Sequence, residues 1–212
     1  IFYGTIVSIP QKKIKFFNVE DIHYYKGKQV SSQFMVNKLK ILDKIFTHEN
    51  GNRILVSQIH GQTFIDLPLD NPFNSIDTQL LSIINDHNID FSFLEVHAEV
   101  TSEKSGIAQN YDGKFTAIYG THVHIPTSDA RVLEKGTCFQ TDIGMTGDYN
   151  SVIGMKKENA IKRMRTGSNT HRLEPAEGIA TISGAIITTN EEKKNSIQSI
   201  QIGGVLDSNL LS

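Results

Sequence analysis

The sequence predicts a single α/β domain in which a pair of mixed sheets is flanked by helices. Two observations predict this class. In the first half, short β-prone segments alternate with helical periodicities, whereas strand-like segments dominate the second half. In addition, no repeat, low-complexity tract or obvious linker divides the 212 residues, so we expect one domain spanning residues 1–212.

The first elements follow from local pattern. Residues 14–19 are β-prone and end in a polar segment, which is typical of a strand followed by a loop. Over residues 29–46, apolar side chains recur every three to five positions, which predicts an amphipathic helix that ends at the polar residues 47–52. We expect a second strand at 53–59 and a short helix at 75–85, which has one apolar face.

The later elements are mostly strands. The apolar segments at 91–96 and 115–119 each run into histidine, and a further strand at 138–141 leads into a glycine-rich turn at 142–147. The remaining expected elements are a basic helix at 156–166 and strands at 180–188 and 196–202, which a charged hairpin loop joins.

Composition and charge exclude several classes of protein. Hydrophobic residues make up 38% and charged residues 21%, an ordinary globular mixture, and 21 Lys and Arg against 23 Asp and Glu give a formal charge of −2. This balance favours neither sequence-specific nucleic-acid binding nor attachment to an anionic membrane. No apolar run approaches the roughly 20 residues that cross a bilayer. A single cysteine, Cys138, cannot form an internal disulfide, so we expect a cytoplasmic protein, with homo-oligomerisation left open.

Three histidines follow the ends of two predicted strands. His97 comes after the strand at 91–96, and His122 and His124 come after the strand at 115–119. In an extended chain, residues i and i+2 share a face, so His122 and His124 could both reach a metal ion there. Surface histidines at strand ends are the alternative for that pair alone, and His97 shifts the balance towards a site at the carboxyl ends of the strands.

A hydrolytic metal site also needs anionic oxygen ligands. Asp21 directly follows the first strand, and Glu49 and Asn50 follow the first helix, where they could supply a bridging carboxylate and an amide oxygen. A turn cap for Asp21 and a solvated turn for Glu49 and Asn50 remain open alternatives.

Several strings in register resemble the bacterial YmdB-like metallophosphoesterases. The resemblance is dense over about residues 90–184. It is carried by His97-Ala98-Glu99 with Thr101-Ser102-Glu103-Lys104, by Gly120-Thr121-His122-Val123-His124, and by Thr141-Asp142-Ile143-Gly144-Met145-Thr146-Gly147. It implies a metallophosphoesterase-like four-layer α-β-β-α sandwich with mixed sheets, and a metal-dependent phosphodiesterase that hydrolyses phosphodiesters such as cyclic nucleotides through a dinuclear metal centre.

The same resemblance implies ligands and cofactors. His97 and His122 would bind one divalent transition-metal ion and His124 the other, with Asp21, Glu49 and Asn50 completing the set. Imidazole with carboxylate suits iron or manganese, and also zinc, better than magnesium. Metal affinity should fall below about pH 6, because neutral imidazole must bind. Glu99 and Asp142 are candidate partners for the remaining ring nitrogens.

The front of the chain departs from the family pattern. Family members have a further strand, helix and strand after the Glu-Asn pair, ending in Gly-Asn-His-Thr. Here the chain passes from Glu49-Asn50 almost directly to the strand at 53–59, and Arg53 stands where that histidine is expected. We therefore expect a partly truncated fold in which residues 1–52 are an eroded or incomplete N-terminal part. The alternative function is a catalytically impaired relative that acts as a binding or assembly module.

Other features of the sequence allow two interpretations each. The cations Lys156, Lys157, Lys162, Arg163 and Arg165 could steer an anionic substrate, although a solvated helix face is the more ordinary explanation. The glycines of the turn at 142–147 could let backbone N–H groups approach a phosphate or could serve geometry alone. An amidohydrolase barrel, which also uses His-x-His, is set aside, because it places that pair on its first strand and typically needs about 250 residues.

Overall fold

A computed structural model describes residues 2–9, 14–22, 24–25, 28–29, 53–65, 69–86, 88–168, 170–189 and 194–207. Before residue 53 the description covers the backbone alone. Four predicted strands, at 53–59, 91–96, 115–119 and 138–141, take part in one central sheet. The predicted helix at 29–46 lies outside the described residues except for Gln29, which belongs to a short strand.

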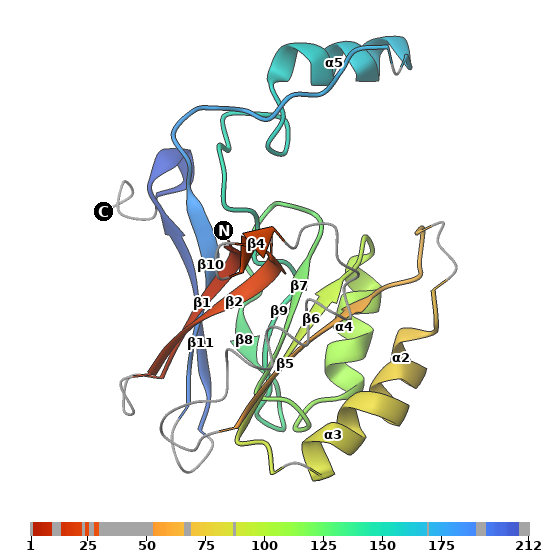
Figure 1. The fold of residues 1–212 in the computed structure, drawn as a ribbon, viewed down its shortest axis with the longest axis vertical. Coiled ribbons are helices and arrows are strands. Elements are labelled where there is room, and N and C mark those ends of the chain that lie inside the picture. Colours follow the sequence, from red (N-terminus) through yellow and green to blue (C-terminus); the bar gives the residue numbers. More distant parts are fainter. Residues whose placement is uncertain are drawn as a thin grey trace.

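The central sheet has the order β5-β6-β7-β9-β8. Strands β5 (Ile54–His60), β6 (Phe91–His97), β7 (Ala117–Thr121) and β9 (Cys138–Gln140) run parallel, and the short β8 (Arg131–Val132) closes one edge antiparallel. Apolar runs such as that of β6 are buried on both faces, as expected for parallel strands. The carboxyl ends of all four parallel strands therefore lie on the same side of the sheet, which we call its carboxyl edge (Figure 1).

Helices cover one face of this sheet (Figure 1). Segments α2 (Pro72–Ser75), η2 (Ile76–Leu80) and α3 (Leu81–Asp86) follow one another, and Asn71 caps the start by accepting from the backbone N–H of Phe73 at 2.9 Å. The predicted helix at 75–85 is confirmed, with a start three residues earlier than expected. Helix α4 (Thr101–Asn110) was not predicted, because Ile107 and Ala108 are the only apolar residues that it adds to the core.

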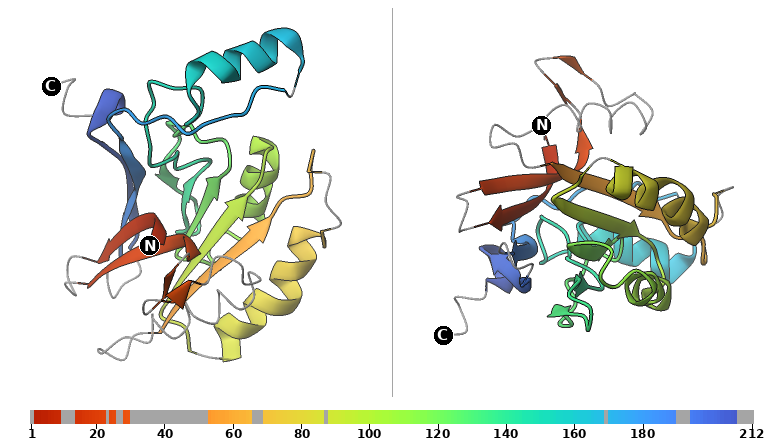
Figure 2. Two further views of the ribbon diagram at one scale, coloured as in Figure 1. Left: turned by 45° about the horizontal axis from the view of Figure 1, so that its top comes forward. Right: turned by 90° about the horizontal axis from the view of Figure 1, so that it is seen from below.

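The opposite face packs against a hairpin of β10 (Ile182–Thr188) and β11 (Ser196–Ile202), both as predicted. Ala185 and Ile187 of β10 join Phe93, Tyr119 and Cys138 in a second core. Strands β1 (Phe2–Ile9) and β2 (Ile14–Ile22) pair antiparallel, and β1 lies beside β10 (Figures 1 and 2). The short β3 (Tyr24–Tyr25) and β4 (Lys28–Gln29) also pair. The predicted mixed α/β fold is confirmed: the central sheet is mostly parallel with one antiparallel edge strand, and the three smaller sheets of the described residues are antiparallel pairs.

Residues 145–180, which we call the arm, project beyond the carboxyl edge of the central sheet (Figures 1 and 2). The arm carries α5 (Lys157–Thr166), the predicted basic helix, which ends at Gly167 in a left-handed conformation. A short 3₁₀ turn, η3 (Gly204–Leu206), follows β11. None of the helices in the described residues combines the length and the apolar character needed to cross a bilayer.

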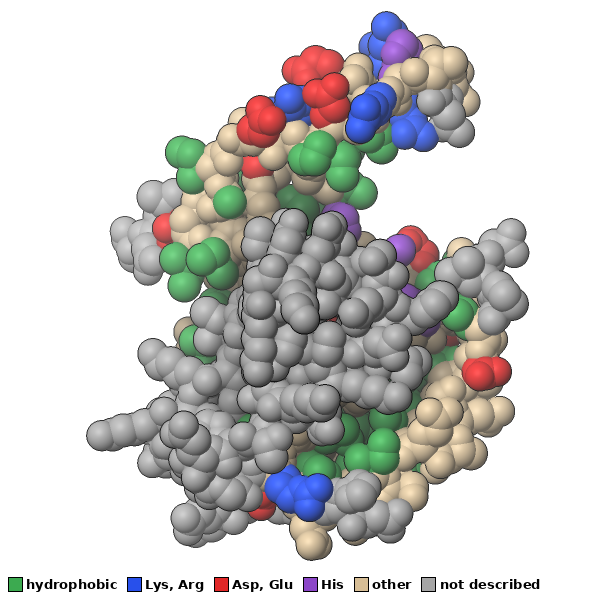
Figure 3. All heavy atoms as spheres, viewed as in Figure 1, with side chains coloured by type: hydrophobic (Ala, Val, Ile, Leu, Met, Phe, Trp, Pro, Cys, Tyr) green, Lys and Arg blue, Asp and Glu red, His purple; other side chains and the backbone are tan. Residues whose placement is uncertain are grey.

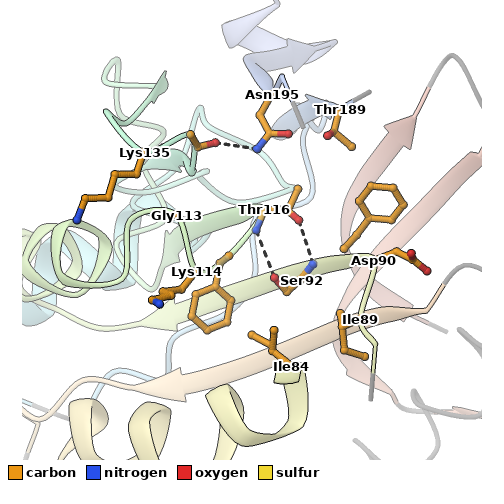
Figure 4. A pocket seen from close by; sticks show the side chains of 13 residues that line it. Ile84, Ile89, Asp90, Ser92, Gly113, Lys114, Thr116, Lys135, Thr189 and Asn195 are labelled. Atoms are coloured by element: carbon orange, nitrogen blue, oxygen red, sulfur yellow. Dashed lines mark hydrogen bonds between the residues drawn. The ribbon is translucent and has the colours of Figure 1, made fainter. Parts of the chain in front are cut away.

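The amino ends of the strands hold a small cavity of about 130 Å³ (Figure 4). Polar groups of Ser92, Thr116 and Asn195 and the residues Lys114 and Lys135 line it beside apolar side chains. It lies at the opposite edge of the sheet from the histidines, so the two edges can be changed independently by mutation.

We expect Gly120→Ala to destabilise the protein. A Cβ at Gly120 would overlap the carbonyl oxygen of Thr141 and Cδ of Lys104, so neighbouring backbone must move. Overpacking of this kind costs about 1–3 kcal/mol. Urea denaturation measures the change. Gly106→Ala is the matched control, since nothing lies within 4 Å of a Cβ there and helix propensity should add about 0.5–1 kcal/mol. Equal stabilities of the two variants would contradict this packing.

Candidate functional site

Imidazole side chains gather at the carboxyl edge of the central sheet. His60 ends β5 and His97 ends β6, and these two residues are directly paired in the parallel register. His97 is in turn paired with Thr121, the last residue of β7, and His122 follows at once. The ring centroids of His60 and His97 lie 5.2 Å apart, and those of His97 and His122 lie 4.8 Å apart. The prediction that strand ends bring His97 and His122 together is confirmed by this geometry.

The closest contact joins two ring nitrogens. Nε2 of His97 lies 3.1 Å from Nδ1 of His122, with the rings almost perpendicular at 88°. Each ring also uses its other nitrogen. Nδ1 of His97 lies 2.9 Å from the Thr121 hydroxyl, and Nε2 of His122 lies 2.9 Å from a carboxylate oxygen of Glu99. The expected pairing of Glu99 with a histidine is confirmed.

These contacts determine which nitrogens carry protons. The Thr121 hydroxyl donates to Oε1 of Glu95 at 2.7 Å, so its oxygen accepts the proton on Nδ1 of His97. Glu99 likewise accepts from Nε2 of His122, because a carboxylate is an acceptor only. Both inner nitrogens, Nε2 of His97 and Nδ1 of His122, then carry a lone pair and face one another. Two lone pairs 3.1 Å apart repel each other, so this arrangement favours a cation, either a proton between the nitrogens or a metal ion beside the line that joins them.

The donor set fits a metal ion in part. Two nitrogens 3.1 Å apart, each about 2.0–2.1 Å from one ion, would subtend about 95–100°, within the range of common coordination geometries. Within the described part of the chain, however, no group of three or more His, Cys, Asp or Glu is arranged to hold an ion. The described pair could therefore provide two ligands at most, and a complete metal site would need further side chains.

The backbone that carries His122 and His124 differs from the prediction. We expected an extended His-x-His that places both rings on one face, but β7 ends at Thr121, and His122 and His124 have φ of 97° and 69°. Both residues are in the left-handed region, which is uncommon outside glycine and clusters at functional sites. Nδ1 of His124 lies 3.0 Å from the carbonyl oxygen of Ile153, in the arm. The loop, not a strand, sets the direction of both rings.

A buried ion pair holds this loop. Nζ of Lys104, which is fully buried, donates to Oδ2 of Asp142 at 2.9 Å and to the carbonyl oxygen of Thr121 at 2.6 Å. The same Asp142 oxygen accepts from the backbone N–H of Val123, between the two histidines, at 3.0 Å. Asp142 was one of two candidate partners for a histidine ring; it binds Lys104 and the backbone of the loops instead.

The glycine-rich turn at 142–147 serves geometry. The N–H of Gly144 donates to Oδ1 of Asp142 at 2.9 Å, and the N–H of Gly147 donates to the carbonyl oxygen of Thr181 at 3.0 Å. Gly144 also has φ of 79°, and a Cβ there would overlap the Tyr149 hydroxyl. Both amide groups are therefore already used, which favours the geometric interpretation over phosphate binding.

The expected oxygen ligands are not tested by the described side chains. The backbone of Asp21 lies in β2, in register with Tyr3 of β1, and its side chain is outside the description. Glu49 and Asn50 lie outside the described residues altogether. All three stay predictions.

The family model for YmdB-like proteins matches residues 43–202, about three quarters of the chain. The chain belongs to the YmdB-like protein family. It is 37% identical over 153 residues to the 2′,3′-cyclic-nucleotide 2′-phosphodiesterase of Bacillus subtilis, a match that covers 72% of this chain and 56% of that protein. The match with a Mycoplasma genitalium protein, named as a putative phosphatase/phosphodiesterase, is 34% identical over 161 residues, 74% of this chain and 55% of the relative.

Two solved structures share the fold. A hypothetical protein of Thermus thermophilus superposes with a TM-score of 0.64 at 38% identity, over 73% of this chain and 60% of that one. A phosphatase of Mycoplasma pneumoniae superposes with a TM-score of 0.63 at 32% identity, over 74% of this chain and 55% of that one. This YmdB-like chain therefore spans little more than half the length of the relatives it matches.

The electrostatics of the YmdB-like site favour neutral imidazole. Burial, reinforced by His122, His60, Lys104 and His124, lowers the pKa of His97 to about 4. Burial and then His122 lower the pKa of His60 as well. His97 therefore stays neutral well below the ordinary histidine pKa of about 6.5, and the expected fall of metal affinity below about pH 6 stays a prediction.

His60 is the residue of this edge that sequence reasoning missed. Its position was visible, because the segment at 53–59 runs into His60 in the way that two other strands run into His97 and His122. The exposed ring of His60 packs edge-on against His97, so a charge on either ring opposes a charge on the other. His60 therefore has a direct influence on the charge of the site.

We expect stability to fall as the pH is lowered from about 7 to 5, partly through His97. Its pKa is lower in the folded state than in the unfolded chain, so the unfolded chain binds more protons between these pKa values. Urea denaturation of the wild type and of His97→Gln checks this, and the variant should lose less stability over that interval. The pKa of Asp129 is about 2, so protonation of this residue affects stability only below this pH interval.

Burial raises the pKa of Glu95, so its protonation makes the folded state more stable as the pH falls, opposite to the effect of His97. The comparison with His97→Gln is therefore needed to isolate the contribution of His97. An identical pH dependence in both proteins would contradict the assignment of the low pKa to His97.

Proposed function

We propose that this protein is a metal-dependent phosphodiesterase that hydrolyses phosphodiesters such as cyclic nucleotides at the carboxyl edge of its central sheet. The observation that carries the proposal is the pair of inner nitrogens on His97 and His122, whose geometry favours a cation. Membership of the YmdB-like family and similarity to a cyclic-nucleotide phosphodiesterase support the reaction class.

His97 and His122 would hold one divalent ion and His124 a second, with oxygen ligands from Asp21, Glu49 and Asn50. Imidazole and carboxylate together favour iron or manganese, with zinc also suitable. Such ions, when bound, lower the pKa of coordinated water and neutralise the charge of a phosphodiester. The protein's own residues orient the ligands: Glu95 and Thr121 act on His97, and Glu99 acts on His122.

The arm provides the side of the site that would meet an anionic substrate. Figure 3 shows a hollow between the arm and the body, with histidine side chains on the body's side of it. Residues 145–180 contain six Lys and Arg against four Asp and Glu, whereas the whole chain carries −2. Lys162 and Arg165 are exposed and form no ion pair with any described residue. A positive arm beside the histidines raises the local concentration of a phosphodiester.

A catalytically impaired relative that works as a binding or assembly module is the second candidate. The observation that favours it is that the chain passes from Glu49-Asn50 almost directly to β5, with Arg53 where the histidine of the Gly-Asn-His-Thr motif is expected. Metal content separates the two candidates: two ions per chain support the enzyme, and one or none supports the module.

His97→Ala and His124→Ala should each abolish manganese-dependent hydrolysis of bis-p-nitrophenyl phosphate, because each removes a proposed ligand. His87→Ala, at a histidine outside both the arm and the proposed ligand set, is the matched control and should keep wild-type activity. If the wild type hydrolyses no phosphodiester with any divalent metal, the proposed enzyme is ruled out while the fold stands.

Reversing charge on the arm should weaken substrate binding without changing the chemical step. For Lys162→Glu with Arg165→Glu we expect KM for a cyclic nucleotide to rise about 3–10-fold at low salt, with kcat nearly unchanged, because the steering is electrostatic and is screened by salt. Lys114→Glu with Lys135→Glu makes the same charge change at the other edge of the sheet. Equal effects of the two double variants would show that net charge alone matters.

A further inference from the structure

We propose that Glu95 is a positioning residue of the site: acting through the Thr121 hydroxyl, it fixes His97 as the Nδ1–H tautomer and so keeps Nε2 available as a ligand. This inference rests on the proposed function only for its consequence in catalysis. The tautomer itself belongs to the metal-free protein and can be measured there.

Glu95 is an unusual residue for its place. It lies in the middle of β6, between Phe93 and His97 on the same face of the strand, and is only 3% exposed. Its Oε1 accepts from Nε2 of Gln58 at 2.9 Å and from the Thr121 hydroxyl at 2.7 Å, both neutral donors, and the described residues give it no ion pair. A buried carboxyl group without a cation partner destabilises the folded protein. Its hydrogen-bond chain to His97 supplies a reason for its presence.

The chain of hydrogen bonds has one direction. Thr121 has a single hydroxyl proton, and the bond to Glu95 uses it, so the Thr121 oxygen can only accept from His97. Without an acceptor at position 95, Thr121 is free to donate its proton to Nδ1 of His97. The ring proton then moves to Nε2, the nitrogen that faces His122, and blocks it as a ligand.

His122 offers an internal contrast. Glu99 orients that ring directly, but the Glu99 side chain is 54% exposed, so water can replace it. Glu95 is buried, and no solvent molecule takes its place when it is removed. We therefore expect Glu99→Gln to have a smaller effect than the loss of the acceptor at Glu95.

The test is the tautomer of His97 in the metal-free protein, read from long-range ¹H–¹⁵N correlation spectra, together with Zn²⁺ affinity from competition with a chromophoric chelator. We expect the Nδ1–H form in the wild type, in Glu95→Gln and in Thr121→Ser, since each keeps an acceptor chain. In Glu95→Met and Thr121→Val we expect the Nε2–H form, with Zn²⁺ binding weakened about 10–100-fold.

Thr141→Val is the matched control. Its hydroxyl donates to Asp129 at 2.6 Å at the end of the neighbouring β9, so the variant loses an equivalent threonine–carboxylate bond that reaches no histidine. It should keep the Nδ1–H form and wild-type Zn²⁺ affinity.

Retention of the Nδ1–H form and of Zn²⁺ affinity in a folded Glu95→Met, or in Thr121→Val, would overturn the inference, as would an equal loss of affinity in Thr141→Val. Should Glu95→Met fail to fold, the pair Thr121→Val and Thr121→Ser gives the same decision. A tautomer change in a protein without phosphodiesterase activity would support the role of Glu95 and defeat only the proposed function.

Discussion

The candidate site depends on the buried ion pair between Lys104 and Asp142. A fully buried lysine is tolerated only when its charge is paired. Here Nζ of Lys104 binds both Asp142 and the carbonyl oxygen of Thr121, so one side chain ties three elements together. Lys104 comes from α4, Thr121 ends β7, and Asp142 follows β9. Because Asp142 also binds the N–H of Val123, the loop that carries His122 and His124 is fixed at its centre. The left-handed backbone of both histidines is held by this anchor, not by strand geometry.

The sequence predicts the large-scale arrangement because that arrangement follows from periodicity. Apolar runs of strand length define β5, β6 and β7, and parallel strands bring their carboxyl ends to one edge, so the convergence of His97 and His122 could be expected. Helix α4 escaped prediction for a physical reason. Its buried face holds Lys104 beside Ile107 and Ala108, so the residue that matters most to the site reads in the sequence as a solvent-facing charge.

Local conformation and hydrogen-bond partners could not be predicted in the same way. The extended geometry expected for His-x-His is wrong because β7 ends at Thr121, the residue before His122, and the backbone of both histidines is left-handed. Asp142 was expected beside a histidine, and Glu99 occupies that role at His122 while Asp142 faces Lys104. The proposed role of Glu95 depends on a hydrogen bond across two strands to Thr121, 26 residues away in the sequence. No pattern within a single strand reveals such a contact.

Charge balance indicates where the remaining ligands of a metal centre belong. Three neutral imidazoles leave the full charge of any bound divalent ions uncompensated, and the nearby carboxylates of Glu95 and Glu99 are already used to orient His97 and His122. Anionic oxygen must therefore come from side chains other than these two. Within this chain the proposed sources, Asp21 and Glu49, precede β5. In the proposed metal centre, the carboxyl edge of the central sheet would therefore supply the nitrogen ligands, and the residues before β5 would supply the oxygen ligands.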